Sequence, residues 1–475
     1  MPLGSESAGA RAPELRRAAP SASSSPSLGQ AAGIFLLSLV IYNANFRCLW
    51  SYDTLPARLS AIALWTTGRL YLDPFESLIR GTPDYWYHRT PGGHLVSRYS
   101  PVVPLLVSPL FLPAAVYAAS RGIDGAEFTT MSEASEKVAA SVVASLSVVA
   151  VYFLLRRFAS PANAALLVLA YAFGTETWVI GSQALWQHGM SELLLALLLL
   201  ALGGRKPAAL VLAGIAAGLL VANRLPNAFF AAAAVGYVLV HRRERMLAFA
   251  AFPAAICAVM LVYNLAFFRD AFGGYSSDGV LYLQRLVRGP DRFDGVLGLL
   301  VSPGRGLLVF SPFLIFLAAS QRAPATAELS RLLAFFVPAA GLQLLFYGTF
   351  YGWVGGHSYG PRLLADLTPV LILGLVPAIE ALGHGTARRL FVGLLAFAIA
   401  VQAIGAFCYP SGGSNWKLDV WRLDNLQYWM ELRGGLAPTS VPRFFSTEKH
   451  ASIDRVGGTR QVAIAGAELE EKRNA

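Results

Sequence analysis

A series of long apolar stretches constrains this chain more than any other feature. A helix needs about 20 apolar residues to cross the hydrocarbon core of a bilayer. Of the 475 residues, 55% are hydrophobic and only 14% are charged, a composition outside the range of soluble domains. We therefore predict an all-α, polytopic membrane protein with about eleven transmembrane helices. The stretches lie at residues 31–50, 138–155, 162–178, 189–203, 207–222, 226–240, 246–268, 303–320, 332–350, 363–382 and 389–408.

Basic residues fall at every second connection between these stretches. By the positive-inside rule these turns are cytoplasmic, and the other connections face outward. The net charge of +10 then reflects orientation in the bilayer and gives no reason to expect a nucleic-acid partner. The basic turns contain Arg156 and Arg157, Arg205 and Lys206, Arg242 to Arg245, Arg322 and Arg331, and Arg388 and Arg389.

The stretch at 101–120 is long enough to cross the membrane, but it contains four prolines. If it crossed, every later basic turn would lie outside. We therefore interpret it as a helix in the outer interface, which makes residues 51–137 a large extracytoplasmic loop. Within that loop, Leu55, Leu59 and Ile62 recur at helical spacing beside Arg58, which predicts an amphipathic juxtamembrane helix.

The remaining organisation follows from this topology. Residues 1–30 are predicted to be a disordered cytoplasmic tail, and residues 409–475 an extracytoplasmic tail. Between them we expect a catalytic module at 31–270 and further transmembrane helices at 271–408. The cysteines lack metal-ligand spacing, and a bridge between Cys48 and Cys408 is left open.

The segment "SYDTLPARL" follows the first stretch on the outer side. Its Asp53, next to Thr54 and before Pro56, has the sequence context of a helix N-cap. Its position beside an outer collection of polar and aromatic loops also suits a catalytic base. We favour the catalytic role, and the two roles are compatible.

Several basic residues also stand at predicted outer ends of spans. Arg224 interrupts an apolar run in "ANRLPN", where an ionisable residue indicates function. Arginine is suited to phosphate because its guanidinium donates to two oxygens and stays charged. The candidate substrate- or phosphate-binding residues are Arg58, Arg98, His188, Arg224, Arg305, His357 and Arg362. Snorkelling to lipid head groups is the alternative for Arg98. We assign no metal ligand, although a divalent metal between Asp53 and His188 is left open.

This order of features resembles the GT-C glycosyltransferases that use polyprenyl-phosphate sugars, especially relatives of protein O-mannosyltransferases and aminoarabinose transferases. "SYDTLPARL" stands where these relatives carry an acidic residue, and "RYSPVVPLL" resembles their proline-containing juxtamembrane segment. "ANRLPN" resembles a turn whose basic residue contacts lipid phosphate. "ALWQHGM" departs from the pattern, since Gln187 and His188 stand where relatives often carry a second carboxylate.

The resemblance implies an inverting glycosyltransferase in a bacterial plasma membrane, with its active site outside the cytoplasm. Asp53 would be the general base, and arginines would bind the donor phosphate. The expected partners are a polyprenyl-phosphate-linked sugar, membrane lipids, and a glycan, lipid or protein acceptor. The leaving phosphate needs no general acid, so one carboxylate suffices. The alternatives are a transporter or flippase for lipid-linked glycans, and a non-catalytic partner in polysaccharide assembly.

Overall fold

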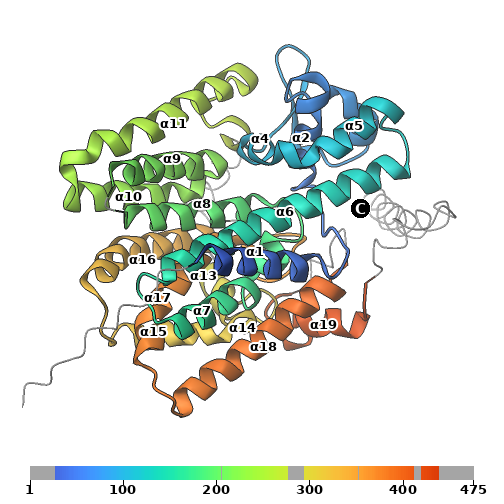
Figure 1. The fold of residues 1–475 in the computed structure, drawn as a ribbon. Helices are drawn as coiled ribbons and strands as arrows, with labels where there is room; N and C mark the ends of the chain where they lie inside the picture. The colour runs from blue at the N-terminus through green and yellow to red at the C-terminus, as the bar shows by residue number, and fades with distance from the viewer. Residues whose placement is uncertain (1–26, 205, 277–293, 351, 411–418, 438–475) are drawn as a thin grey trace, which may run out of the picture.

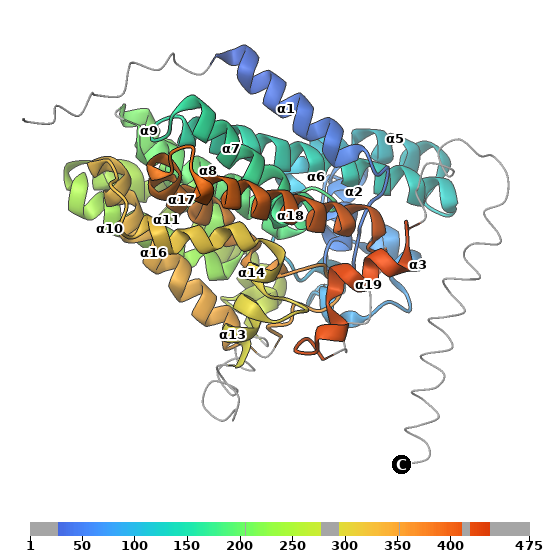
Figure 2. The same cartoon turned by 90° about the horizontal axis from the view of Figure 1, so that it is seen from below.

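The computed structural model describes residues 27–204, 206–276, 294–350, 352–410 and 419–437, which are mostly helical. The N-terminal tail predicted for 1–30, apart from residues 27–30, and most of the C-terminal tail at 409–475 lie outside the described residues. Figures 1 and 2 show the longer helices packed side by side as one bundle. They are α1 (Leu28–Asn43), α6 (Ala126–Leu155), α7 (Pro161–Phe173), α8 (Gln187–Leu202), α9 (Pro207–Asn223), α10 (Ala228–His241), α11 (Met246–Phe268), α16 (Ala327–Gly348), α17 (Thr368–Ala381) and α18 (Thr386–Cys408).

Shorter elements complete the fold. The loop after α1 contains α2 (Leu55–Thr67), α3 (Glu76–Ile79), α4 (Val102–Val107), α5 (Leu112–Arg121) and the strands β1 (Tyr87–Arg89) and β2 (Leu95–Ser97). The two strands are antiparallel and pair Tyr87 with Ser97. The C-terminal half adds α13 (Asp294–Val301), α14 (Leu307–Phe310), α15 (Leu317–Ser320) and α19 (Gln427–Gly434). Two short 3-10 segments contribute to the site described below: η5 (Leu225–Asn227) and η9 (Arg362–Leu367).

Six helical segments of the described chain are long and apolar enough to cross a membrane. This agrees with an all-α, multi-pass membrane protein, while the count of eleven stays a prediction. One of the six is Val102–Arg121, which we interpret as interfacial. The expected span at 303–320 is not one helix. It is divided into α14, a 3-10 turn that begins at Pro312, and α15, because proline cannot donate the next helical hydrogen bond.

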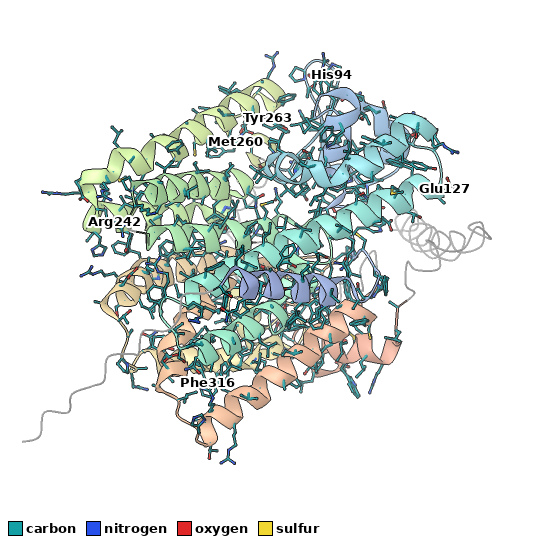
Figure 3. All side chains as sticks on the ribbon, viewed as in Figure 1. His94, Glu127, Arg242, Met260, Tyr263 and Phe316 are labelled. Atoms are coloured by element: carbon teal, nitrogen blue, oxygen red, sulfur yellow. The ribbon has the colours of Figure 1, made fainter. Side chains whose placement is uncertain are left out.

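The predicted basic turns meet at one end of the bundle. Arg157, after α6, donates to the carbonyl of Leu200 near the end of α8 and pairs with Glu328 at the start of α16. Arg242, after α10, donates to the carbonyl of Gly204. Figure 3 shows Arg242 at the opposite end from His94 and Glu127. The structure therefore separates a basic end of the bundle from the end that carries the 51–125 loop.

The helix expected around Arg58 is present as α2, but the expectation that it is amphipathic, with one exposed face, is wrong for most of its length. Its residues 55–63 are all buried, against α4 and α5 among others. Arg58 lies 3.5 Å from Glu136 and 3.8 Å from Glu133 on α6, and its guanidinium faces the ring of Trp50. It therefore ties the loop to the bundle and does not line the cavity described below.

We expect Arg58→Met to lower the free energy of unfolding by about 3–5 kcal/mol, because it leaves the carboxylates of Glu133 and Glu136 buried without their guanidinium partner. The measurement is the unfolding midpoint in detergent. Arg80→Met is the matched control, since Arg80 is exposed on the same loop. Equal midpoints for the two variants would contradict this role of Arg58.

Candidate functional site

A cavity of about 450 Å³ lies where Asp53 meets the bundle. Its wall combines acidic, basic and apolar side chains from the turn before α2, the start of α8, η5, the start of α10, the end of α16 and η9. It is lined by Asp53, Tyr99, Trp186, Gln187, His188, Arg224, Leu225, Pro226, Ala228, Phe229, Phe346, Tyr347, Phe350, Arg362 and Leu363. Four of the predicted site residues, Asp53, His188, Arg224 and Arg362, are thus brought together.

Asp53 is held by side chains that are distant in the sequence. Its Oδ2 lies 2.6 Å from Nη1 of Arg362, and its Oδ1 accepts a 2.7 Å hydrogen bond from the hydroxyl of Tyr99. The expected N-cap is wrong: Thr54 occupies that position, and no side chain caps α2. Because the carboxylate of Asp53 binds Arg362 and Tyr99, it is turned toward the cavity and away from the helix end.

The charge of a neighbouring arginine and several hydrogen bonds determine the pKa of the Asp53 carboxyl group. Burial by itself raises the pKa of this carboxyl, but the charge of Arg362 and hydrogen bonds from Arg362, Tyr99 and Tyr85 outweigh it, so the pKa lies below its ordinary value. Burial and the nearby Asp53 carboxylate also raise the pKa of the Tyr85 phenol. Asp53 is therefore ionised at neutral pH and able to accept a proton.

Arg362 is fixed in place by more than its ion pair. Its guanidinium lies 4.2 Å from the ring centroid of Trp186, and Nη2 donates a 2.7 Å hydrogen bond to the carbonyl of Gly355. Its Nε has no hydrogen-bond partner in the structure. Gly355 has a φ of +80°, a conformation that glycine adopts without strain. These contacts fix the orientation of the Arg362 guanidinium where it lines the cavity, so it is preoriented for an anion that binds there.

A second carboxylate, Asp366, lies behind the cavity wall. It is fully buried and pairs with Arg224, and its Oδ1 lies 2.9 Å from Nδ1 of His188. Amide and phenol groups of Gln343 and Tyr347 lie 3.4 Å from its Oδ2. Asp366 thus compensates the positive charge of Arg224 and orients the imidazole of His188.

Sequence reasoning missed Asp366, although a usable signal was present. It is an acidic residue inside an otherwise apolar run, "PRLLADLTP", which is the argument that singled out Arg224. Tyr99 and Trp186 were quoted only within motifs. Tyrosine and tryptophan are common at membrane interfaces, so nothing in the sequence distinguished these two from anchors.

The structure places the other predicted residues outside this cavity. Arg305 is buried and donates to the carbonyls of Ser358 and Gly356 and to the side chain of Gln427. It therefore braces the loop before η9. His357 is exposed on that loop and is not among the residues that line the cavity. Arg98 lines two neighbouring hollows.

Two cysteines and two aromatic residues named below lie in the interior of the protein. Cys48 and Cys408 are buried and are not joined by a disulfide. Trp353 and Tyr359 are also core residues, and the hydroxyl of Tyr359 donates to the carbonyl of Val401. Within the described residues no group of three or more His, Cys, Asp or Glu side chains could hold a metal ion.

No family model, curated protein or solved structure matches the chain.

The lowered pKa of Asp53 gives a signed pH dependence. Ionised Asp53 stabilises the fold above the ordinary aspartate pKa of about 3.9, and this stability is lost as the pH falls through the lower folded-state pKa. We expect the difference in melting temperature between wild type and Asp53→Asn to stay constant from pH 7 to about pH 5 and to narrow below about pH 4. A difference that narrows between pH 7 and 5 would instead indicate a raised pKa.

Proposed function

We propose that the protein is an integral membrane glycosyltransferase that moves a sugar from a polyprenyl-phosphate donor to an acceptor hydroxyl outside the cytoplasm. One observation carries the proposal: the Asp53 carboxylate and the guanidinium groups of Arg362 and Arg224 line a single cavity whose remaining wall is largely apolar. A base, cations for phosphate and an apolar surface for an isoprenoid chain are what this reaction requires.

The apolar part of the wall suits the polyprenyl chain. It is formed mainly by Phe229 of α10 and by Phe346 and Phe350 at the end of α16, with Leu225 and Leu363 beside them. A water-soluble sugar nucleotide would gain nothing from this surface, whereas burial of an isoprenoid is favourable by about 25 cal/mol per Å². The lining therefore favours a donor that has both a phosphate and a hydrocarbon chain.

In the proposed reaction, the acceptor oxygen attacks the anomeric carbon and Asp53 takes the hydroxyl proton. The bond between the anomeric carbon and the phosphate oxygen breaks, and its electron pair leaves with the polyprenyl phosphate. Arg362 and Arg224 stabilise the charge that develops on this phosphate. Because the attack is direct, the configuration of the anomeric carbon is inverted. No step requires a metal.

The contact between Arg362 and Asp53 implies that the donor binds before Asp53 accepts the proton. A carboxylate that is paired with a guanidinium 2.6 Å away is a weak base. A donor phosphate competes for the same guanidinium, and its binding therefore frees Asp53 to accept a proton. The hydroxyl of Tyr99 keeps the carboxylate in position during this exchange. Asp53 is then an effective base only when the donor is bound.

Asp53→Asn should abolish turnover in a transfer assay with purified protein in liposomes and a polyprenyl-phosphate sugar. We expect kcat to fall by about 10²- to 10⁴-fold, the usual contribution of general base catalysis, while donor binding is retained. Asp124→Asn is the matched control, since Asp124 is exposed before α6. Full activity of Asp53→Asn would remove its assignment as base.

Arg224→Gln should weaken binding of the donor by about 10- to 100-fold, because it removes a charge-assisted hydrogen bond to the phosphate. Direct binding of a polyprenyl phosphate measures this, with Arg80→Gln as the control for loss of an exposed guanidinium. Unchanged affinity would exclude Arg224 from the phosphate site. If the protein moves the lipid-linked head group across liposomes without transferring sugar, the alternative of a flippase is correct.

A further inference from the structure

A second cavity, of about 320 Å³, adjoins the cavity that contains Asp53, which we call the donor cavity. The second cavity is lined mainly by apolar residues of α9 and α11. The two cavities share Tyr99 and Leu225. Figure 3 shows Met260 and Tyr263, two of its lining residues, on α11. We call this hollow the α9/α11 cavity. Its lining side chains include Val221, Ala222, Cys257, Met260 and Leu261.

The α9/α11 cavity lies beside an apolar helix that the described part of the chain leaves largely uncovered, as expected of a helix in contact with lipid. Only 6% of the most apolar window of α11 is buried inside the protein. Two residues that line the cavity, Leu261 and Phe272, are themselves exposed by 44% and 61%. A hydrocarbon chain could therefore enter the cavity sideways from the membrane without crossing water.

A small hollow lies between the α9/α11 cavity and the proposed base and shares lining residues with both cavities. It has room for about one water molecule and is lined by Asp53, Tyr99 and Gln187, which also line the donor cavity. Its wall also includes Ser100 and Tyr263, which line the α9/α11 cavity. A hydroxyl group that points inward from the α9/α11 cavity would therefore approach Asp53 from another direction than the donor.

An arginine lies at one end of the α9/α11 cavity. Arg98 lines it and also lines a neighbouring polar hollow of about 400 Å³, which contains His88 and Arg89 and one carboxylate, Asp84. Arg98 donates to the carbonyls of Tyr85 and Gly274, which hold its guanidinium between the two hollows. Arg89 in the polar hollow pairs with Glu76, so the charge beside the apolar lining is that of Arg98. An apolar lining that ends beside a guanidinium matches a lipid with an anionic head group.

We propose that the acceptor is a membrane lipid with an anionic head group, bound in the α9/α11 cavity, and that its hydroxyl attacks the sugar. This inference rests on the proposed function, since Asp53 takes the hydroxyl proton and the polyprenyl phosphate leaves as described above. The lipid tail lies along α11 and the head group lies near Arg98. A soluble glycan or protein would leave the apolar surfaces of the cavity without a partner.

Two matched substitutions separate this cavity from the donor cavity. Ala222→Trp fills the α9/α11 cavity, and Ala228→Trp fills the donor cavity. Binding is measured for two probes with the full chain in phosphatidylcholine nanodiscs: a fluorescent phosphatidylglycerol and a polyprenyl phosphate. We expect Ala222→Trp to weaken phosphatidylglycerol binding by about tenfold or more with polyprenyl phosphate unaffected, and Ala228→Trp to do the reverse.

The outcomes distinguish this inference from the proposed function. The proposal of a lipid acceptor is overturned if wild-type protein does not bind phosphatidylglycerol, or if wild type and Ala222→Trp bind it equally well. It is also overturned if Ala222→Trp transfers sugar to a soluble glycan at the wild-type rate. Absence of polyprenyl phosphate binding in wild type overturns the proposed function instead, whatever phosphatidylglycerol does.

A chemical block avoids variants that fail to fold. Cys257 lines the α9/α11 cavity and is exposed, whereas Cys48 and Cys408 are buried. Treating folded wild-type protein with a bulky maleimide should therefore reduce phosphatidylglycerol binding by about tenfold and leave polyprenyl phosphate binding unchanged, and Cys257→Ser should be resistant. If complete modification of Cys257 leaves the binding of both phosphatidylglycerol and polyprenyl phosphate unchanged, the inference is contradicted.

Discussion

The ion pair between Asp53 and Arg362 is the contact on which the proposed site depends. It joins the turn that follows the first helix to the turn that begins η9, 309 residues later in the chain. Two charges this close, each only partly exposed, stabilise each other and hold both groups at the edge of one cavity. The same pairing lowers the basicity of Asp53. The site is therefore poised for a ligand that competes for Arg362.

The arginines around the site have carboxylate or carbonyl partners in the absence of a ligand. They differ in whether they also line the cavity, and this difference distinguishes structural arginines from candidates for ligand binding. Arg58 has two carboxylates and Arg305 has backbone carbonyls, and both are sealed in the interior. Arg224 pairs with Asp366 but still reaches the cavity wall. An arginine that lies at the wall of a cavity is the kind that can bind phosphate.

The sequence predicted the all-α, multi-pass class of fold, because hydropathy acts locally along the chain, and several of its basic turns lie at one end of the bundle. It also selected Asp53, His188, Arg224 and Arg362, which share one cavity. Prediction from the sequence failed for residues whose role depends on contacts with distant parts of the chain. The partners of Arg58 lie on α6, and those of Arg305 lie on distant loops, so no spacing in the sequence identified either as structural. Asp366 was overlooked among apolar residues.

In the proposed function, a lipid phosphate binds between Arg224 and Arg362 and releases Asp53. A cryo-electron microscopy structure with a polyprenyl phosphate in nanodiscs tests it most directly. We predict phosphate density within hydrogen-bonding distance of both guanidinium groups, the chain along Phe229 and Phe346, and an Asp53 carboxylate that no longer contacts Arg362. Density for the phosphate elsewhere, with the contact between Asp53 and Arg362 unchanged, would contradict the account.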